Sequence, residues 1–385
     1  MKSLAEVLTE KGVDLTGWKL QNATGVSADG TVIVGYGTRS SAPTAFIVNL
    51  GDPDDGPTDP GITTPEDLAA SLTSGTAPAQ QGQRAVTTTL NRSLFAATNT
   101  IPVAPPVQLA SADPNMDFSI SRSPVWSAYA VGSIGTSSGD WSLDGTVGLM
   151  AEVSEDLRLG AGIIGGYGDT ETYLGGSSRV YAAGGSVLAA YEQPEGLRLY
   201  GTAFVAHLSV DTDRHYYNGA GIDGSNGETD GVGYGAAVRG GWAFPVHRDI
   251  SVMPYVELRW SKTKLDGYTE TDGPFPATYS DQKSERTTSH VGLQGDLGVT
   301  PDLRVYPRVA WGHQLYSDEG TLTATTIGLT QTLNPGPEDR SWAEGAIAAI
   351  WRLSDRMTLS AELAGRTGDT AEPEASLMIG IALQL

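Results

Sequence analysis

The residues with the clearest potential for covalent chemistry form a Gly-x-Ser-x-Gly pattern, Gly135-Thr136-Ser137-Ser138-Gly139. In hydrolases this pattern places a nucleophilic serine on a sharp turn that follows a strand and precedes a helix. Here the segment lies between two stretches of strand-like alternation, and no helical pattern follows it. We therefore interpret it as a turn of small polar residues, and a hydrolase remains the least favoured alternative function.

Residue types that bind metals are scattered along the chain. The five histidines, at positions 207, 215, 247, 290 and 313, include no closely spaced pair of the kind that metal motifs use. The acidic run Asp52-Pro53-Asp54-Asp55-Gly56 lacks the ligand spacing of a calcium loop. We predict no catalytic, cofactor-binding or metal-binding residues, no cofactor and no enzymatic activity.

Composition narrows the class of protein. The 385 residues carry a net charge of −21, which makes nucleic acid a poor partner. Hydrophobic residues make up 39% and there are 49 glycines, which argues against a disordered acidic chain. No stretch approaches the roughly 20 consecutive apolar residues of a membrane helix. The mean hydropathy of −0.18 still permits a membrane barrel, because barrel strands alternate apolar and polar residues.

Three zones divide the chain. Residues 1–50 contain a short helical pattern and two short strand patterns, and residues 51–115 are rich in Pro, Thr, Ala and Asp and are typical of a linker. Residues 116–385 are a long run of strand-like segments. Residues 1–6 lack the apolar core of a signal peptide, so we expect an export signal to lie outside this sequence if the chain is exported.

The third zone carries an internal repeat, in which a short acidic turn precedes alternating apolar residues. The five copies are 154–159, 194–199, 247–252, 300–305 and 354–359. Longer polar segments lie between them, at 211–230, 266–284 and 317–340. Short turns at one end and long loops at the other are typical of an outer-membrane barrel, with the turns in the periplasm.

Alternation over about ten residues per segment predicts the strands and the two faces of each. Val291 and Leu293, for example, share one face, while His290 and Gln294 share the other. We expect an all-β fold, a transmembrane antiparallel up-and-down β-barrel of about twelve strands. The expected strands are 125–135, 140–153, 157–168, 178–191, 197–210, 230–245, 250–264, 283–298, 303–316, 340–352, 356–366 and 374–385.

A soluble β-sandwich or soluble barrel is the alternative, and full charges on the polar face favour the membrane. A water-filled lumen tolerates such charges. The predicted lumen-facing barrel charges are Glu152, Arg158, Glu257, Arg259, Arg304, Arg352 and Glu362. Trp141, Trp260 and Trp351 lie near strand ends, as an interfacial girdle requires.

The linker contains a mildly amphipathic helix at about 80–98, in which Val86, Leu90 and Leu94 recur at helical spacing. A barrel of about twelve strands could enclose a helix, which is about 10–12 Å across. We therefore expect this helix in the lumen, where Arg84, Asn91 and Arg92 would pair with inward-facing acids. A surface helix is the alternative.

Residues 116–385, together with this preceding helix and the terminal strand 377–385, resemble the C-terminal β-domain of autotransporters, the type V secretion proteins of Gram-negative bacteria. The terminal aromatic residue usual in that family is absent, since the chain ends in Leu385. Residues 23–35 and 45–46 look like the last unit of the propeller-like extracellular repeats of some passengers, so residues 1–50 would be a passenger remnant.

The resemblance implies an outer-membrane translocator that exports or anchors an N-terminal passenger at the cell surface, with the helix as a plug. It also implies insertion by the barrel-assembly machinery, contact with outer-membrane lipid and lipopolysaccharide, and a monomeric barrel whose N-terminal segment is extracellular. An outer-membrane diffusion porin with an open lumen is the alternative.

Overall fold

The computed structural model describes residues 2–51, 60–99, 125–137, 140–193, 196–334, 339–368 and 373–385. The acidic run 52–56, the segment 101–114 and the turn residues 194–195 therefore lie outside the described residues. Among the described residues, no helix combines the length and apolar character that crossing a membrane requires.

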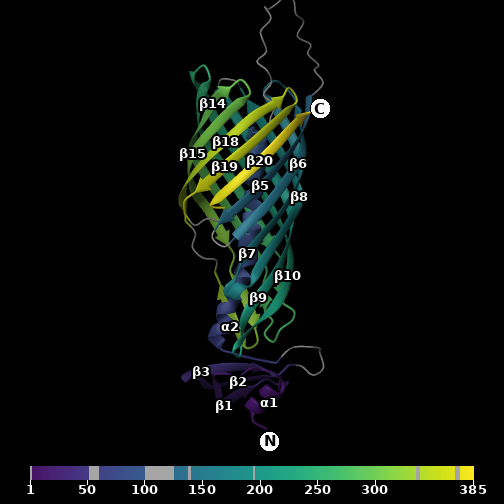
Figure 1. Ribbon diagram of the computed structural model, residues 1–385, viewed down its shortest axis with the longest axis vertical. Helices are drawn as coiled ribbons and strands as arrows, with labels where there is room; N and C mark the ends of the chain where they lie inside the picture. Colours follow the sequence, from purple (N-terminus) through teal and green to yellow (C-terminus); the bar gives the residue numbers. More distant parts are fainter. Residues whose placement is uncertain are drawn as a thin grey trace, which may run out of the picture.

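A closed antiparallel barrel of twelve strands dominates the described part of the chain (Figure 1). Each strand pairs with its neighbour in the chain, and β20 closes the barrel against β5, where Leu377 lies opposite Ile134. Closure leaves no unpaired edge. The strands are β5 (Val125–Ser137), β6 (Asp140–Glu152), β7 (Leu157–Glu171), β8 (Ser177–Glu192), β9 (Gly196–Asn218), β10 (Gly221–His247), β11 (Ile250–Leu265), β14 (Gln282–Thr300), β15 (Leu303–Glu319), β18 (Ser341–Ser354), β19 (Met357–Arg366) and β20 (Ala375–Gln384).

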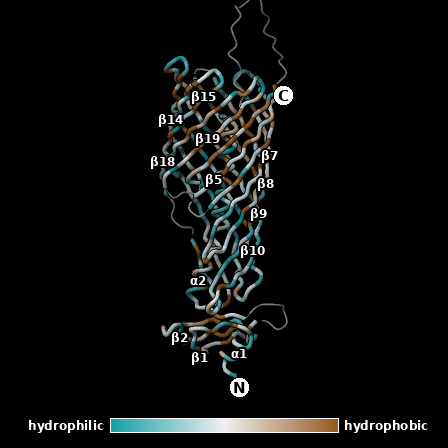
Figure 2. The backbone as a smooth tube through the Cα atoms, in the orientation of Figure 1, coloured by the Kyte–Doolittle hydropathy of each residue, from teal (hydrophilic) through white to brown (hydrophobic). Residues whose placement is uncertain are grey.

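The alternation of the strands confirms the predicted facing. Val291 is 61% exposed on the outer wall, whereas its neighbour His290 is 1% exposed and faces the lumen. Figure 2 shows brown and teal positions mixed along each barrel strand. Large apolar side chains cover the outer wall, which in water would be an aggregation hazard. The wall is therefore the lipid-facing surface of a membrane barrel.

Aromatic residues flank this apolar wall near both ends, as predicted. Trp141, Tyr167 and Tyr181 form a contiguous row on β6, β7 and β8, with ring centroids 5.1 and 5.2 Å apart. Trp126, Trp242 and Trp351 are exposed near the other end. Such girdles mark the two membrane interfaces.

The short acidic turns gather at one end of the barrel, here named the turn end, where the C-terminus also lies (Figure 1). The opposite end is named the loop end. The prediction of a long loop at 211–230 is wrong, because β9 and β10 continue as a paired hairpin to Asn218 and Gly221. These residues are polar because the hairpin tip projects beyond the apolar wall, so no apolar face was needed there.

The other two polar segments also contain strands that alternation did not reveal. β12 (Tyr268–Thr269), β13 (Thr278–Tyr279), β16 (Leu322–Thr326) and β17 (Leu329–Leu333) form a four-stranded sheet at the loop end. This small sheet and the projecting tip of β9 and β10 are named the cap. Strands of two to five residues are too short to show a period in the sequence.

The N-terminal residues form α1 (Leu4–Glu10) and a four-stranded antiparallel sheet, β1 (Trp18–Val26), β2 (Val32–Arg39), β3 (Ala42–Asn49) and β4 (Gly61–Thr63). Ser3 and Glu6 form a capping box that starts α1. The sheet rests on the cap, since the Asn49 side chain donates to the Pro274 carbonyl at 2.7 Å and the Gly219 amide donates to the Ile62 carbonyl at 2.6 Å.

Two helical segments lead from this sheet into the barrel. α2 (Pro65–Leu72) begins at Thr64, whose hydroxyl accepts from the Asp67 amide at 3.0 Å, and Pro65 occupies the first helical position. A short 3-10 turn, η1 (Thr73–Thr76), joins it to α3 (Ala77–Asn99). α3 extends three residues further toward the N-terminus than the predicted helix at 80–98.

Candidate functional site: the helix in the lumen

α3 lies inside the barrel, as the sequence predicted. It contacts every strand from β5 through β11 as well as β14 and β20, and Figure 1 shows it running along the barrel axis. From Gln81 to Ala97 its side chains are buried except those of Arg84 and Asn91, which are partly buried. A helix buried on all sides would ordinarily be apolar, so the polar residues of α3 need partners on the wall.

Glycines let the helix and the wall approach closely. A Cβ on Gly233 of β10 would lie 2.5 Å from Cγ2 of Val86, and one on Gly235 would lie 3.1 Å from Leu90. On the helix side, a Cβ on Gly82 would lie 2.8 Å from Cγ2 of Thr263. Real side chains do not sustain contacts under 3.0 Å. A side chain at Gly233 or Gly82 would therefore push the helix away from β10 or β11.

Both predicted arginines of the helix are paired. Arg92 lies 3.5 Å from a carboxylate oxygen of Asp144 on β6, and its Nε donates to Oγ1 of Thr146 at 2.7 Å. Arg84 forms an ion pair with Asp140 at the start of β6. Two pairs on one strand set both the rotation and the height of the helix in the lumen.

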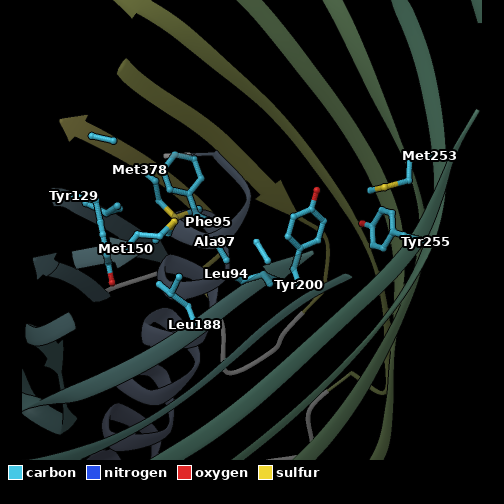
Figure 3. Close-up of a cluster of buried hydrophobic side chains, with 14 residues drawn as sticks. Leu94, Phe95, Ala97, Tyr129, Met150, Leu188, Tyr200, Met253, Tyr255 and Met378 are labelled. Carbon is cyan, nitrogen blue, oxygen red and sulfur yellow. The ribbon is translucent and has the colours of Figure 1, made fainter. Parts of the chain in front are cut away.

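Nearer the turn end, apolar contacts replace the ion pairs. Leu94, Phe95 and Ala97 are buried in one cluster with Tyr129, Met150, Tyr200 and Met378, and Figure 3 shows these side chains gathered around the last turns of the helix. Tyr129 in turn fits over Gly148 and Gly162 of the wall. The helix is thus held by ion pairs and apolar contacts in its middle and by hydrophobic burial alone near its end.

Buried charges line the wall that faces away from β6. Glu257 accepts from Nε of Arg239 at 2.5 Å and also from Arg259, and Arg308 lies 3.1 Å from Glu362. Beside them is a small space lined by these arginines and by Asn91 of the helix. Its volume of about 30 Å³ is enough for roughly two waters.

The remaining predicted charges lie near the turn end and pair separately. Arg158 pairs with Glu192, Arg304 lies 2.6 Å from Asp296, and Arg352 lies 2.7 Å from Asp302 in the adjacent turn. Glu152 is half-buried directly across the strand pair from Arg158. These four residues are therefore not brought together with the lumen helix.

Several lumen residues were missed by the sequence reasoning. Asp140 and Asp144 bind the helix, and Arg239 and Glu344 belong to the charged wall. Each lies on the buried face of its strand by alternation, so extending the same period-two reading would have included them. Which of them pair could not be read from spacing, because the partners lie on different strands.

The candidate catalytic pattern does not form a nucleophile elbow. Gly135–Ser137 ends β5 and Asp140 begins β6, so the segment joins two strands, and positions 138–139 lie outside the described residues. No group of three or more potential metal-ligating side chains occurs within the described ranges.

Comparison with known proteins points to one family. The family model "Autotransporter beta-domain" matches residues 129–364, well over half of the chain. The solved translocator domain of the autotransporter NalP from Neisseria meningitidis has a TM-score of 0.51 at 12% identity, over 68% of this chain and 88% of that chain. At this identity the likeness shows the fold alone.

Two curated proteins also match in sequence. An uncharacterised protein in the trpE-trpG intergenic region of Pseudomonas putida is 27% identical over 191 residues, which is 48% of this chain and 32% of that protein. Lipase 1 of Photorhabdus luminescens is 23% identical over 263 residues, which is 65% of this chain and 39% of that protein. The chain thus spans less than two fifths of the length of either relative.

Proposed function

The chain belongs to the autotransporter β-domain family, so residues 125–385 form an outer-membrane translocator barrel, and we propose that this barrel carries its N-terminal segment to the cell surface and then anchors it there. In this proposal α3 remains in the lumen as a plug. The loop end faces the outside, and the N-terminal sheet is extracellular.

One observation carries the proposal: the chain runs through the lumen from one end of the barrel to the other. Gly75, just before α3, lies against Tyr279 of the cap at the loop end. Phe95, near its end, lies among Tyr200 and Met378 toward the turn end, where the first barrel strand starts at Val125 opposite Glu152. Residues before α3 therefore lie beyond the loop end, whereas the first barrel strand starts at the turn end.

No bond chemistry is needed for this role, and we propose that the barrel is not an enzyme. The Gly-x-Ser-x-Gly pattern joins two strands, whereas a nucleophile elbow requires a helix after the serine. Lipase 1 is named for a lipase activity, but this chain spans only 39% of that protein. We propose that any activity of a longer chain containing this barrel lies outside the barrel.

The proposal also includes insertion by the barrel-assembly machinery and a monomeric state. The monomeric state is supported by the described barrel, which is closed and leaves no strand edge for a partner. The N-terminal sheet would be the membrane-proximal end of a passenger. That it is a unit of a propeller-like repeat stays a prediction.

The chain contains no cysteine, so single-cysteine labelling can test the orientation without background. We would express Lys11→Cys and, as its matched partner, Asp355→Cys behind a signal peptide in a Gram-negative host. Both positions are exposed, one on the N-terminal domain and the other in the turn between β18 and β19. A membrane-impermeant maleimide should label Lys11→Cys in intact cells, and Asp355→Cys only after the outer membrane is permeabilised. Labelling in the reverse order would refute the proposed orientation.

A further inference from the structure

The hairpin tip, where β9 ends and β10 begins, carries an Asn-Gly dipeptide, Asn218-Gly219. Asparagine followed by glycine is prone to lose its side-chain amide, because glycine has no Cβ to keep its own backbone nitrogen away from the asparagine side chain. The chain contains one other such dipeptide, Asn226-Gly227, further along β10. The two share their chemistry and differ in how the fold holds them.

The side chain of Asn218 joins the barrel to the N-terminal domain. Its Oδ1 accepts from the backbone amide of Ile62 on β4 at 2.8 Å, and its Nδ2 donates to a carboxylate oxygen of Asp223 on β10 at 3.2 Å. The neighbouring Gly219 amide donates to the Ile62 carbonyl at 2.6 Å. One dipeptide thus satisfies both backbone groups of Ile62.

This bridge gives β4 a partner on each of its edges. Along one edge β4 pairs with β3, where Ile62 lies opposite Val48, and along the other it meets the hairpin tip. Gly61 allows the close approach, since a Cβ there would lie 2.8 Å from Oδ1 of Asn218 and 2.9 Å from Pro274. The N-terminal sheet is therefore hydrogen-bonded to the barrel through β4.

Docking of β4 also restrains the two groups that would react. Deamidation begins when the backbone nitrogen of Gly219 attacks Cγ of Asn218, which requires this nitrogen to leave its hydrogen bond and lose its proton. In the docked state the Gly219 amide is bound to the Ile62 carbonyl, and Oδ1 of Asn218 is bound to the Ile62 amide. The attack therefore needs β4 to leave the hairpin tip first.

The second dipeptide is held in a different way. Asn226 and Gly227 lie within β10, opposite Asp213 and Thr212 of β9. Asn226 also exchanges two backbone hydrogen bonds with Thr271, at 3.0 and 2.7 Å. Its restraint comes from strand pairing within the barrel and the cap, and does not involve β4. Asn226 is thus an internal reference for any effect that depends on β4.

We propose that Asn218 is a site of spontaneous deamidation that is protected while β4 is docked, and that its modification frees β4 and loosens the N-terminal domain. Water is the only co-reactant. The Gly219 nitrogen forms a bond to Cγ of Asn218, the bond from Cγ to Nδ2 breaks, and ammonia leaves with the proton of the Gly219 amide. Water then opens the resulting succinimide at either carbonyl, which yields aspartate or isoaspartate at this position.

Either product weakens the bridge to β4. Loss of Nδ2 places a second carboxylate beside Asp223, so a hydrogen bond of 3.2 Å becomes a repulsion between like charges. Isoaspartate also lengthens the main chain by one methylene group before Gly219, which displaces the amide that donates to Ile62. Other contacts with the cap persist, such as that of Asn49 with Pro274, so the domain loosens and stays attached.

Mass spectrometry of the full chain, refolded in detergent and kept at mildly alkaline pH, tests the site. Trypsin releases residues 215–239 as one peptide that contains both dipeptides, and fragmentation localises the change. Gly61→Val, which pushes β4 from the hairpin tip, should speed deamidation of Asn218 at least fivefold and that of Asn226 less than twofold. Gly345→Val is the matched control, because its Cβ meets open space on β18, and it should change neither rate.

Equal rates at Asn218 in the parent chain and in Gly61→Val would overturn the protection by β4, and an unmodified Asn218 in both would overturn the site. Hydrogen exchange of the Ile62 amide verifies that β4 has left the hairpin tip. If β4 stays docked in this variant, Ile62→Pro, which removes the amide that donates to Asn218, takes its place.

Three further variants test the consequence of the modification. Asn218→Asp reproduces one product and should speed hydrogen exchange of the Ile62 amide at least tenfold. Asn218→Asp/Asp223→Asn, which removes the like charges and restores a donor, should recover most of the protection. Asn226→Asp makes the same change at the other dipeptide and should have no effect. Unchanged exchange in Asn218→Asp would overturn the release of β4, and heat-modifiable migration on a gel verifies that each barrel is folded.

This inference goes beyond the proposed function and can fail separately from it. Deamidation and hydrogen exchange in detergent do not depend on which end of the barrel faces the outside, whereas cysteine labelling in cells depends on nothing else. Labelling that placed the loop end in the periplasm would refute the proposed orientation and leave the chemistry of Asn218 as it is.

Discussion

The guanidinium of Arg92 on α3 lies 3.5 Å from a carboxylate oxygen of Asp144 on β6, and the two side chains are 0% and 3% exposed. The attraction within a buried ion pair adds little net stability to the fold, because both charges must be taken out of water. Removing only one of the two partners is strongly destabilising. With one partner removed, the other charge stays in the lumen with its compensation lost.

This pair leads to a prediction for a double-mutant cycle. Arg92→Leu and Asp144→Leu should each lower the free energy of unfolding by about 3–5 kcal/mol, while the double variant should recover much of the loss because neither charge remains. Urea unfolding in detergent, followed by tryptophan fluorescence, measures each corner of the cycle. A double variant as unstable as the sum of the two single variants would show that the residues are not coupled.

The lumen helix should block ion flow. Conductance of the intact chain in a planar bilayer should stay small, because α3 contacts nine of the twelve strands, and charged side chains of β15, β18 and β19 line the space of about 30 Å³ on its other side. Deleting residues 80–100 should raise the single-channel conductance severalfold. An unchanged conductance after the deletion would contradict the plug, and a large conductance of the intact chain would favour the diffusion porin.

Packing of the helix against β10 should be sensitive to one methyl group. Gly233→Ala places a Cβ 2.5 Å from Cγ2 of Val86, and such overpacking costs about 1–3 kcal/mol. Adding Val86→Ala should recover part of this loss. Gly345→Ala on β18 is the matched control, because its Cβ would meet open space. The thermal midpoint of the unfolding gel shift compares the three variants with the parent chain, and equal midpoints for the two glycine variants would contradict close packing at Gly233.

The cap should depend on a second buried ion pair. Arg214 binds Glu270 at 2.7 Å with both side chains 1% exposed, and Arg214 also donates to Oγ of Ser71 on α2 at 2.7 Å. Burial alone would lower the pKa of Arg214, but the hydrogen bond and charge of Glu270, together with the interactions with Tyr279 and Tyr216, outweigh it and the net shift is upward. The guanidinium therefore stays charged.

Glu270→Ala should thus leave the buried Arg214 cation without its carboxylate partner and destabilise the cap by about 3–5 kcal/mol. Glu10→Ala, which breaks the exposed pair with Lys2, should cost less than about 1 kcal/mol. Limited proteolysis of folded barrels reports on the cap, with cleavage near α2 expected for Glu270→Ala alone. Equal protection of the two variants would show that Arg214 does not need its partner.

Tyr216, in the tip of β9 beyond the apolar wall, makes the cap sensitive to high pH. Burial raises the pKa of Tyr216 to about 12, against about 10 for an exposed tyrosine. The neutral phenol is the form that the folded cap holds, so its contribution is complete below pH 10. It is lost as the pH rises from 10 to 12, by up to about 3 kcal/mol.

Cap stability measured by proteolysis between pH 9 and 12 should fall in the parent chain. It should fall less in Tyr216→Phe, which has no phenol to ionise. Tyr36→Phe, at a half-exposed side chain on β2, is the control and should follow the parent chain. A parent chain whose cap is equally stable at pH 9 and 12 would contradict the burial of Tyr216.

Much of the barrel was predictable because its physics is local. Lipid on one side and a polar lumen on the other impose a period of two along each strand. The sequence alone therefore predicts that Val291 faces the lipid and His290 faces the lumen. The acidic turns recur because tight hairpins need turn residues at each return. α3 was recognisable from the helical spacing of Val86, Leu90 and Leu94.

Tertiary structure decided what depends on residues far apart in the chain. The polar tip of β9 and β10 carries no apolar signal, so its strands follow only from their pairing to Asn218. Asp144 lies 52 positions from Arg92, and Asn218 lies 156 positions from Ile62. Barrel closure brings the first pair together across the lumen, and docking of β4 on the hairpin tip brings the second together. Alternation tells which face a side chain occupies, but only closure and docking determine which partner it meets there.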